Sequence, residues 1–147
     1  MTIAAGPQKA IVIFDFIITI DHKIGMIIKS GPGSLTTRHT PTIATANLVA
    51  DYRVPVVVVT NGEDAEIIET DSDKVLARGL DQIPAQPKLT QILRDHSFSP
   101  VSSKKREMAA RIVYCYEIDG ACPCDTTVCR LEEGDLQNGD NKDESLK

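Results

Sequence analysis

Two apolar runs near the N-terminus, IVIFDFIITI (residues 11–20) and IGMIIK (residues 24–29), constrain the fold most, because only the polar tripeptide Asp-His-Lys separates them. A connection of two to four polar residues is too short for a crossover helix, so the runs are predicted to pair as an antiparallel hairpin. Asp15 lies in the first run and Lys29 ends the second. The hairpin therefore predicts an acid and a lysine on neighbouring strands.

The remaining pattern predicts a central mixed sheet flanked by helices. The run PVVVVT at residues 55–60 is typical of a central strand that is covered on both faces. Further strands are expected at AEIIET, after an Asn-Gly turn, and at residues 74–79. Apolar spacing predicts helices over residues 41–52, 86–95 and 103–116. The expected fold class is α/β, arranged as an α+β sandwich.

Composition indicates one modest domain, residues 1–131, followed by an acidic tail. The chain has 147 residues, of which 41% are hydrophobic. Residues 132–147 contain six acids and two lysines, which leaves 15 acids and 14 Lys or Arg in residues 1–131. The tail composition predicts disorder, and the body is nearly neutral. No run of eighteen apolar residues and no secretory pattern is present, so we expect no membrane span and a cytoplasmic location.

An acid and a lysine on adjacent strands form the arrangement that metal-dependent phosphodiesterases use. Carboxylates hold Mg²⁺, and the lysine steadies a water molecule or the charge that develops on phosphorus. Such sites usually carry a second carboxylate two residues before the lysine, where this chain has Ile27. The simpler alternative is that Asp15 accepts a loop hydrogen bond and Lys29 snorkels at a strand end. Three acids follow the central strand and are alternative ligands: Glu63, Asp64 and Glu66.

Downstream segments make the pattern more specific, because IIK, GPGSL, an arginine, PVVVVTNG and KKREMAARIVY follow in order. Over roughly residues 10–131 the chain resembles the N-terminal domain of type I restriction enzyme R subunits, which has the restriction-endonuclease-like fold built around a D…(D/E)xK motif. The resemblance implies that Asp15 and Lys29 are the catalytic aspartate and lysine, with Mg²⁺ or Mn²⁺ as cofactor and DNA as partner. Ile27 departs from the acidic member of the motif. The expected function is therefore DNA binding by a metal-dependent endodeoxyribonuclease fold whose cleavage is impaired or lost.

The loop GPGSLTTRH, which precedes a predicted helix, is a candidate DNA-binding segment. Its glycines, hydroxyls and basic side chains are suited to receive a phosphate near a helix start. The candidate residues are Ser34, Arg38 and His39. The alternative is a tight turn followed by helix-capping residues. The basic run Lys104–Arg106 and the isolated His96 are expected to be solvated.

Four cysteines lie within fifteen residues: Cys115, Cys122, Cys124 and Cys129. In a cytoplasmic chain, four clustered thiols are suited to hold Zn²⁺ or an iron–sulfur cluster. The spacing C-x6-C-x-C-x4-C differs from that of a standard zinc ribbon. Packed and free thiols, or a local disulfide, are the alternative.

Two other functions stay open. The first is a non-catalytic module that binds DNA or a protein partner and carries a four-cysteine metal site. The second is a degenerate haloacid-dehalogenase-like phosphatase. The phosphatase requires a second acid at Ile17 and a helix after the first strand. The chain has no GxxxxGK[ST] loop, so it encodes no ATP-driven translocation.

Overall fold

The structure is a computed structural model that describes residues 1–119. It contains a two-stranded sheet, a five-stranded sheet and three α-helices, an α+β architecture that confirms the expected fold class. The strands are β1 (Thr2–Ala5), β2 (Gln8–Ile11), β3 (Phe16–Ile20), β4 (Lys23–Ser30), β5 (Val56–Thr60), β6 (Ala65–Glu69) and β7 (Lys74–Arg78). The helices are α1 (His39–Ala46), α2 (Gln86–Asp95) and α3 (Ser103–Tyr114), with 3₁₀ turns at Thr36–Arg38 and Leu80–Gln82 and a π-helical turn at Cys115–Asp119.

The predicted hairpin is present as β3 and β4, which pair antiparallel with Phe16 opposite Ile28. Asp21 and His22 both have positive φ, 48° and 64°, as expected for the two central residues of a tight hairpin turn. The prediction of one strand over residues 11–20 is wrong. Residues 8–11 pair with β1 in the separate sheet, and the strand of the hairpin begins only at Phe16.

The central strand and its neighbours agree with the sequence pattern. The five-stranded sheet has the order β3-β4-β5-β6-β7. β5 is parallel to β4, and the other pairs are antiparallel. Every residue of β5 is buried, as expected for a strand covered on both faces. Because β3 is an edge strand followed by a hairpin and not by a helix, the topology excludes the phosphatase alternative.

Helix α1 forms the crossover between β4 and β5, and it is shorter than predicted. It ends at Ala46 and not at residue 52. Arg106 from α3 donates hydrogen bonds to the backbone oxygens of Asn47, Leu48 and Ala50, at 3.1, 3.2 and 2.7 Å. A long-range guanidinium thus satisfies carbonyl groups that lie beyond the helix end. The expectation that this basic run is only solvated is wrong for Arg106.

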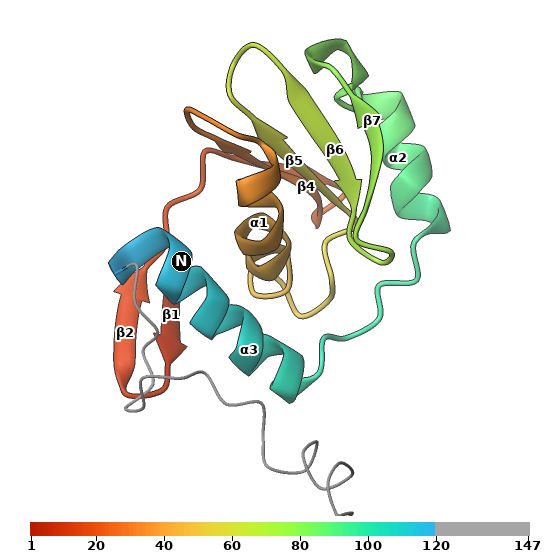
Figure 1. The fold of residues 1–147 in the computed structure, drawn as a ribbon. Helices are drawn as coiled ribbons and strands as arrows, with labels where there is room; N and C mark the ends of the chain where they lie inside the picture. Colours follow the sequence, from red (N-terminus) through yellow and green to blue (C-terminus); the bar gives the residue numbers. More distant parts are fainter. Residues whose placement is uncertain (120–147) are drawn as a thin grey trace, which may run out of the picture.

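The elements stack in layers, with α2 on one face of the large sheet, α1 on the other face, and α3 and the β1–β2 hairpin beyond α1 (Figure 1). Three apolar clusters hold these layers together: one between the sheet and α2, one between the sheet and α1, and one among α1, α3 and the small sheet. Helix α1 is therefore packed on two sides. The ends of β4 and β5 and the start of α1 meet at one end of the sheet.

A second long-range contact corrects the expectation for His96. Its ring nitrogens lie 3.0 Å from the Arg53 backbone oxygen and 3.4 Å from the Asp71 carboxylate, and its side chain is 7% exposed. The imidazole ties the segment after α2 to the loops before β5 and after β6. Among the described residues, no helix is long and apolar enough to cross a membrane.

Candidate functional site

The predicted aspartate and lysine lie on adjacent segments of the β3–β4 hairpin. The β3–β4 register pairs Phe16 with Ile28, which places Asp15 beside the end of β4, where Lys29 lies. Asp15 itself lies one residue before β3 and is exposed. Its carboxylate accepts a hydrogen bond from the Ser30 backbone N–H at 2.9 Å. The expected placement on neighbouring chain segments is correct, and the aspartate also has the structural role named as its alternative.

Lys29 is buried, and its ammonium group is bound inside the molecule. Only 8% of its side chain is exposed. The Nζ atom lies 2.9 Å from Oε2 of Glu117 and donates to the Ile13 backbone oxygen at 3.3 Å. A buried ammonium requires such partners because its desolvation is costly. Glu117 comes from the π-helical turn after α3, 88 residues away in sequence, and no local sequence signal identifies it.

Ile27 is part of the core, at the position where the sequence resemblance implies a second acid. Its side chain is completely buried in the cluster under α1, together with Val57, Val59 and Ile68. A carboxylate at this depth would lie in an apolar environment that strongly disfavours charge. The structure therefore has apolar packing and no open polar position at residue 27.

Glu66 is the one acid following the central strand that lies on the same row of the sheet as Lys29. The register pairs Lys29 with Val59, Val59 with Glu66, and Glu66 with Arg78. Directly paired residues share a face, and a spacing of two strands separates the Lys29 and Glu66 backbones by about 10 Å. This row of charged side chains on the α1 face is called the ionic row below: Lys29, Glu66 and Arg78.

The Glu66 carboxylate has its own partners. Its Oε1 lies 3.0 Å from Nε of Arg78, and its Oε2 contacts Nε2 of His39 at the start of α1. Only 8% of the Glu66 side chain is exposed. The position of Glu66 next to the apolar pair Ile67 and Ile68 was the only sequence sign of this contact. Glu63 and Asp64 instead lie in the exposed turn between β5 and β6.

The candidate DNA-binding residues lie between β4 and α1, and two of them have partners within the chain. Nη2 of Arg38 donates to the Pro32 backbone oxygen at 2.6 Å. A Cβ at Gly31 would lie 2.4 Å from Nη1 of Arg38, so the glycine leaves the space in which the guanidinium folds back. His39 contacts Glu66, whereas Ser34 is exposed. The loop thus presents Ser34 to solvent and uses Arg38 and His39 for internal contacts.

The metal-ligand predictions have a limited basis in this part of the chain. Within residues 1–119, no group of three His, Cys, Asp or Glu side chains is placed to hold a metal ion. The residues around Lys29 do not fit Mg²⁺ or Mn²⁺, because Asp15 supplies a single carboxylate and Ile27 supplies none. Cys115 is half-buried at the end of α3. Cys122, Cys124 and Cys129 lie outside the described residues.

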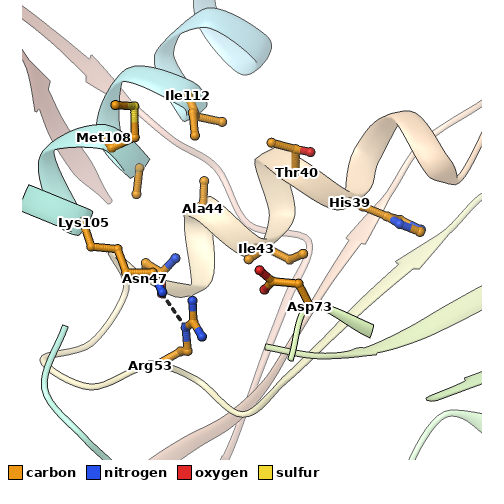
Figure 2. A pocket seen from close by; sticks show the side chains of 11 residues that line it. His39, Thr40, Ile43, Ala44, Asn47, Arg53, Asp73, Lys105, Met108 and Ile112 are labelled. Carbon is orange, nitrogen blue, oxygen red and sulfur yellow. Dashed lines mark hydrogen bonds between the residues drawn. The ribbon is translucent and has the colours of Figure 1, made fainter. Parts of the chain in front are cut away.

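A hollow of about 380 Å³ lies between α1 and α3, and its lining includes His39 at the start of α1. Ile43, Ala44, Met108 and Ile112 give it an apolar wall, as Figure 2 shows. Its polar lining includes Arg53, whose Nε donates to Asn47 at 3.0 Å, the dashed contact in Figure 2. This hollow contains neither member of the predicted catalytic pair.

Comparison with known proteins supports the resemblance read from the sequence. The family model described as "Type I restriction enzyme R protein N terminus" matches residues 2–84. The match runs from β1 to the turn before α2, so it includes Asp15, Lys29, the loop before α1 and Glu66, and it stops before Glu117. No curated protein and no solved structure gives a significant match. The matched segment is more than half of the 147 residues, and the chain therefore belongs to the family of the type I restriction enzyme R protein N terminus.

Proposed function

We propose that this domain contacts DNA through a nuclease-like fold and has lost metal-dependent cleavage. The observation that carries the proposal is Ile27, which is completely buried at the position of the motif's second acid. Mg²⁺ binds oxygen ligands in near-octahedral geometry and gains most from charged ones. One exposed aspartate beside a buried lysine supplies too few of them.

The other acids near the sheet do not repair this loss. Glu66 is about two strand spacings from Lys29 and is held by Arg78 and His39. Glu117 is close, but its carboxylate forms an ion pair with the lysine ammonium. Both carboxylates are thus bound by basic side chains, whereas in an active centre they would bind the metal ion.

DNA contact is supported by the family and by Lys29 near the end of β4. A DNA phosphate that approaches Lys29 would have to replace the Glu117 carboxylate. Ser34 and the backbone amides of the loop before α1 would receive the neighbouring phosphate. Residues 1–119 contain 14 acids and 13 Lys or Arg, so the electrostatic attraction is small and binding is expected to be weak and salt-sensitive. Such a role also agrees with the cytoplasmic location expected from the sequence.

The test is incubation of metal-free full-length protein with supercoiled plasmid, with and without Mg²⁺ or Mn²⁺, followed by gel analysis of nicking and of retardation. We expect no metal-dependent nicking, and retardation that disappears between about 50 mM and about 200 mM salt. Asp15→Ala is the matched control for cleavage, and Lys29→Met is the control for phosphate contact. Nicking that requires the metal and is lost in Asp15→Ala would overturn the loss of cleavage. Absence of retardation at low salt would overturn the DNA contact.

A further inference from the structure

The two edges of the five-stranded sheet are protected to different degrees. Edge strand β7 begins with Lys74 and ends with Arg78. The exposed Leu76 lies midway between these two charged residues. Charged residues on an edge are a common protection against unwanted strand pairing. Edge strand β3, with the sequence FIITI, carries no charge and no proline. Among the described residues, no strand pairs with its free side.

Exposed apolar side chains gather along the same segment. Within residues 1–119, four of the eight large hydrophobic residues that are exposed lie in residues 11–17: Ile11, Ile13, Phe16 and Ile17, with exposures of 70%, 80%, 60% and 43%. Scattered exposed hydrophobic residues are ordinary, but a run of them along an unprotected edge is typical of an interaction surface. Ile11 and Ile13 precede β3, and Phe16 and Ile17 lie on it. We call residues 16–20 the β3 edge.

A hollow of about 440 Å³ lies directly beside this edge on the α2 face of the sheet. Its lining comes from β3, from Met26 on β4, and from the segment that leads into α2: Ile18, Thr19, Ile20, Met26, Pro84, Gln86 and Leu89. An extended peptide can add to such an edge as a further strand. It would form main-chain hydrogen bonds with the edge and place alternate side chains in the groove between the strand and the helix.

The charges around the β3 edge favour another protein over a second copy of this chain. Asp21 lines the hollow, is exposed, and has no ion-pair partner among residues 1–119. Asp15 and Asp21 flank β3, so antiparallel pairing of two copies about Ile18 would bring Asp15 of each copy near Asp21 of the other. Like charges brought close together across paired strands are destabilising. A basic residue of the partner beside Asp21 would complement this end of the strand.

We propose that the β3 edge binds an extended segment of a partner protein, with apolar side chains at every second position and a basic residue at the end that lies beside Asp21. The segment adds a sixth strand to the sheet and fills the hollow next to α2. This proposal does not depend on DNA contact or cleavage, because the β3 edge uses neither Lys29 nor the loop before α1.

The test uses a fluorescent synthetic peptide, acetyl-Lys-Val-Thr-Val-Thr-Val-Thr-Lys, titrated with the full-length protein and followed by anisotropy. Two further peptides carry backbone N-methyl groups, one on all valines and one on all threonines. In an added strand only alternate N–H groups point to the edge. One methylated peptide is therefore expected to lose binding, while the other binds nearly as the parent does. Equal binding by both would show adsorption without strand addition and would overturn the proposal.

Matched variants on the two edges locate the site. Ile17→Lys places a charge on the β3 edge and is expected to weaken peptide binding by about tenfold or more, whereas Leu76→Lys on β7 leaves it unchanged. Asp21→Asn is expected to weaken binding less and to reduce its salt dependence. Circular dichroism confirms that each variant is folded.

Three results would contradict the assignment. The first is no binding at about 1 mM protein, which corresponds to negligible affinity. The second is equal weakening by Ile17→Lys and Leu76→Lys. The third is a wild-type dimer in sedimentation that Ile17→Lys converts to a monomer, because the occupant of the β3 edge would then be a second copy.

Discussion

The two faces of the five-stranded sheet differ in what their alternating residues do. On the α2 face, Met26, Val58 and Ile67 pack against Leu89 and Leu93, and this cluster of buried residues is apolar. On the α1 face, Ile27, Val57 and Ile68 form a similar core. At the end where β4 and β5 finish, however, that face carries the ionic row. The same strands thus contribute apolar core residues on both faces. They carry the charged side chains of the ionic row on the α1 face alone.

The difference bears directly on the proposed function. Lys29, Asp15 and the loop that follows β4 lie together, whereas Ile27, where the resemblance places a second acid, is part of the hydrophobic core. Each retained charge on the α1 face is paired with another group of the chain. The site is therefore held together as an internal ion-pair network without the carboxylates that a metal requires.

The largest effect is expected for Ile27→Ala, because the residue is completely buried. Deletion of a buried isoleucine side chain to alanine costs about 2–5 kcal/mol in the free energy of unfolding. Ile67→Ala on the α2 face is expected to fall in the same range, which would make the two faces equal as cores. Ile17→Ala, the same deletion at an exposed position, is expected to cost less than about 1 kcal/mol. Urea denaturation measures all three, and a cost for Ile27→Ala as small as that of Ile17→Ala would indicate an open site at this position.

A smaller effect is expected when Glu117 is changed to Gln. The substitution leaves the buried Lys29 ammonium without its charged partner, and we expect a loss of about 1–3 kcal/mol. Adding Lys29→Met removes the unpaired charge, so the double variant is expected to be more stable than Glu117→Gln alone. A double-mutant cycle gives the coupling energy. Additive effects of the two substitutions would contradict the structural pairing.

The same variant reports on DNA contact. With the carboxylate removed, Lys29 is available to a phosphate, and retardation is expected to require about two- to fivefold less protein. The gain is expected to disappear in the double variant with Lys29→Met. A gain that survives without Lys29 would place the DNA contact elsewhere on the surface.

Glu66→Gln tests the centre of the ionic row. The amide keeps the shape of the side chain but loses the charge that faces Arg78 and His39. Because Arg78 is mostly exposed, we expect a cost of about 1 kcal/mol. Glu69→Gln on the same strand is the control, with an expected change within about 0.5 kcal/mol. Equal costs for the two variants would show that the row contributes no specific stability.

The smallest effect is expected for Ser34→Ala in the loop before α1. Because the side chain is exposed, the free energy of unfolding is expected to change by no more than about 0.5 kcal/mol. Loss of one hydroxyl contact to a phosphate is expected to weaken retardation by about two- to fivefold. A stability loss above about 1 kcal/mol would instead assign the serine to loop structure.

Local sequence patterns predicted most of the sheet because they report what each segment buries. The hairpin, the buried strand at residues 56–60 and the next two strands all follow from apolar alternation and turn residues. The early end of α1 could not be read in this way, because it is fixed by Arg106, which lies about 60 residues downstream. The separate β1–β2 sheet was missed because residues 8–11 continue into an apolar run that extends to the hairpin.

The candidate site was predictable from local sequence only, and its long-range contacts were not. Asp15, Lys29 and the departure at Ile27 are visible as a motif with fixed spacing. Their state in the fold is not, since the partner of Lys29 is Glu117 and the depth of Ile27 depends on how α1 packs. Long-range pairing decides whether a motif acts as a catalytic site or as a structural one.

The most direct test of the proposed loss of the metal site is a calorimetric titration of metal-free protein with Mn²⁺, with Asp15→Ala and Asp21→Ala as the paired variants. Because a single exposed carboxylate holds Mn²⁺ weakly, we expect no heat signal that depends on Asp15 at micromolar metal. Micromolar Mn²⁺ binding that is lost in Asp15→Ala and kept in Asp21→Ala would contradict the account and show a working metal centre beside Lys29.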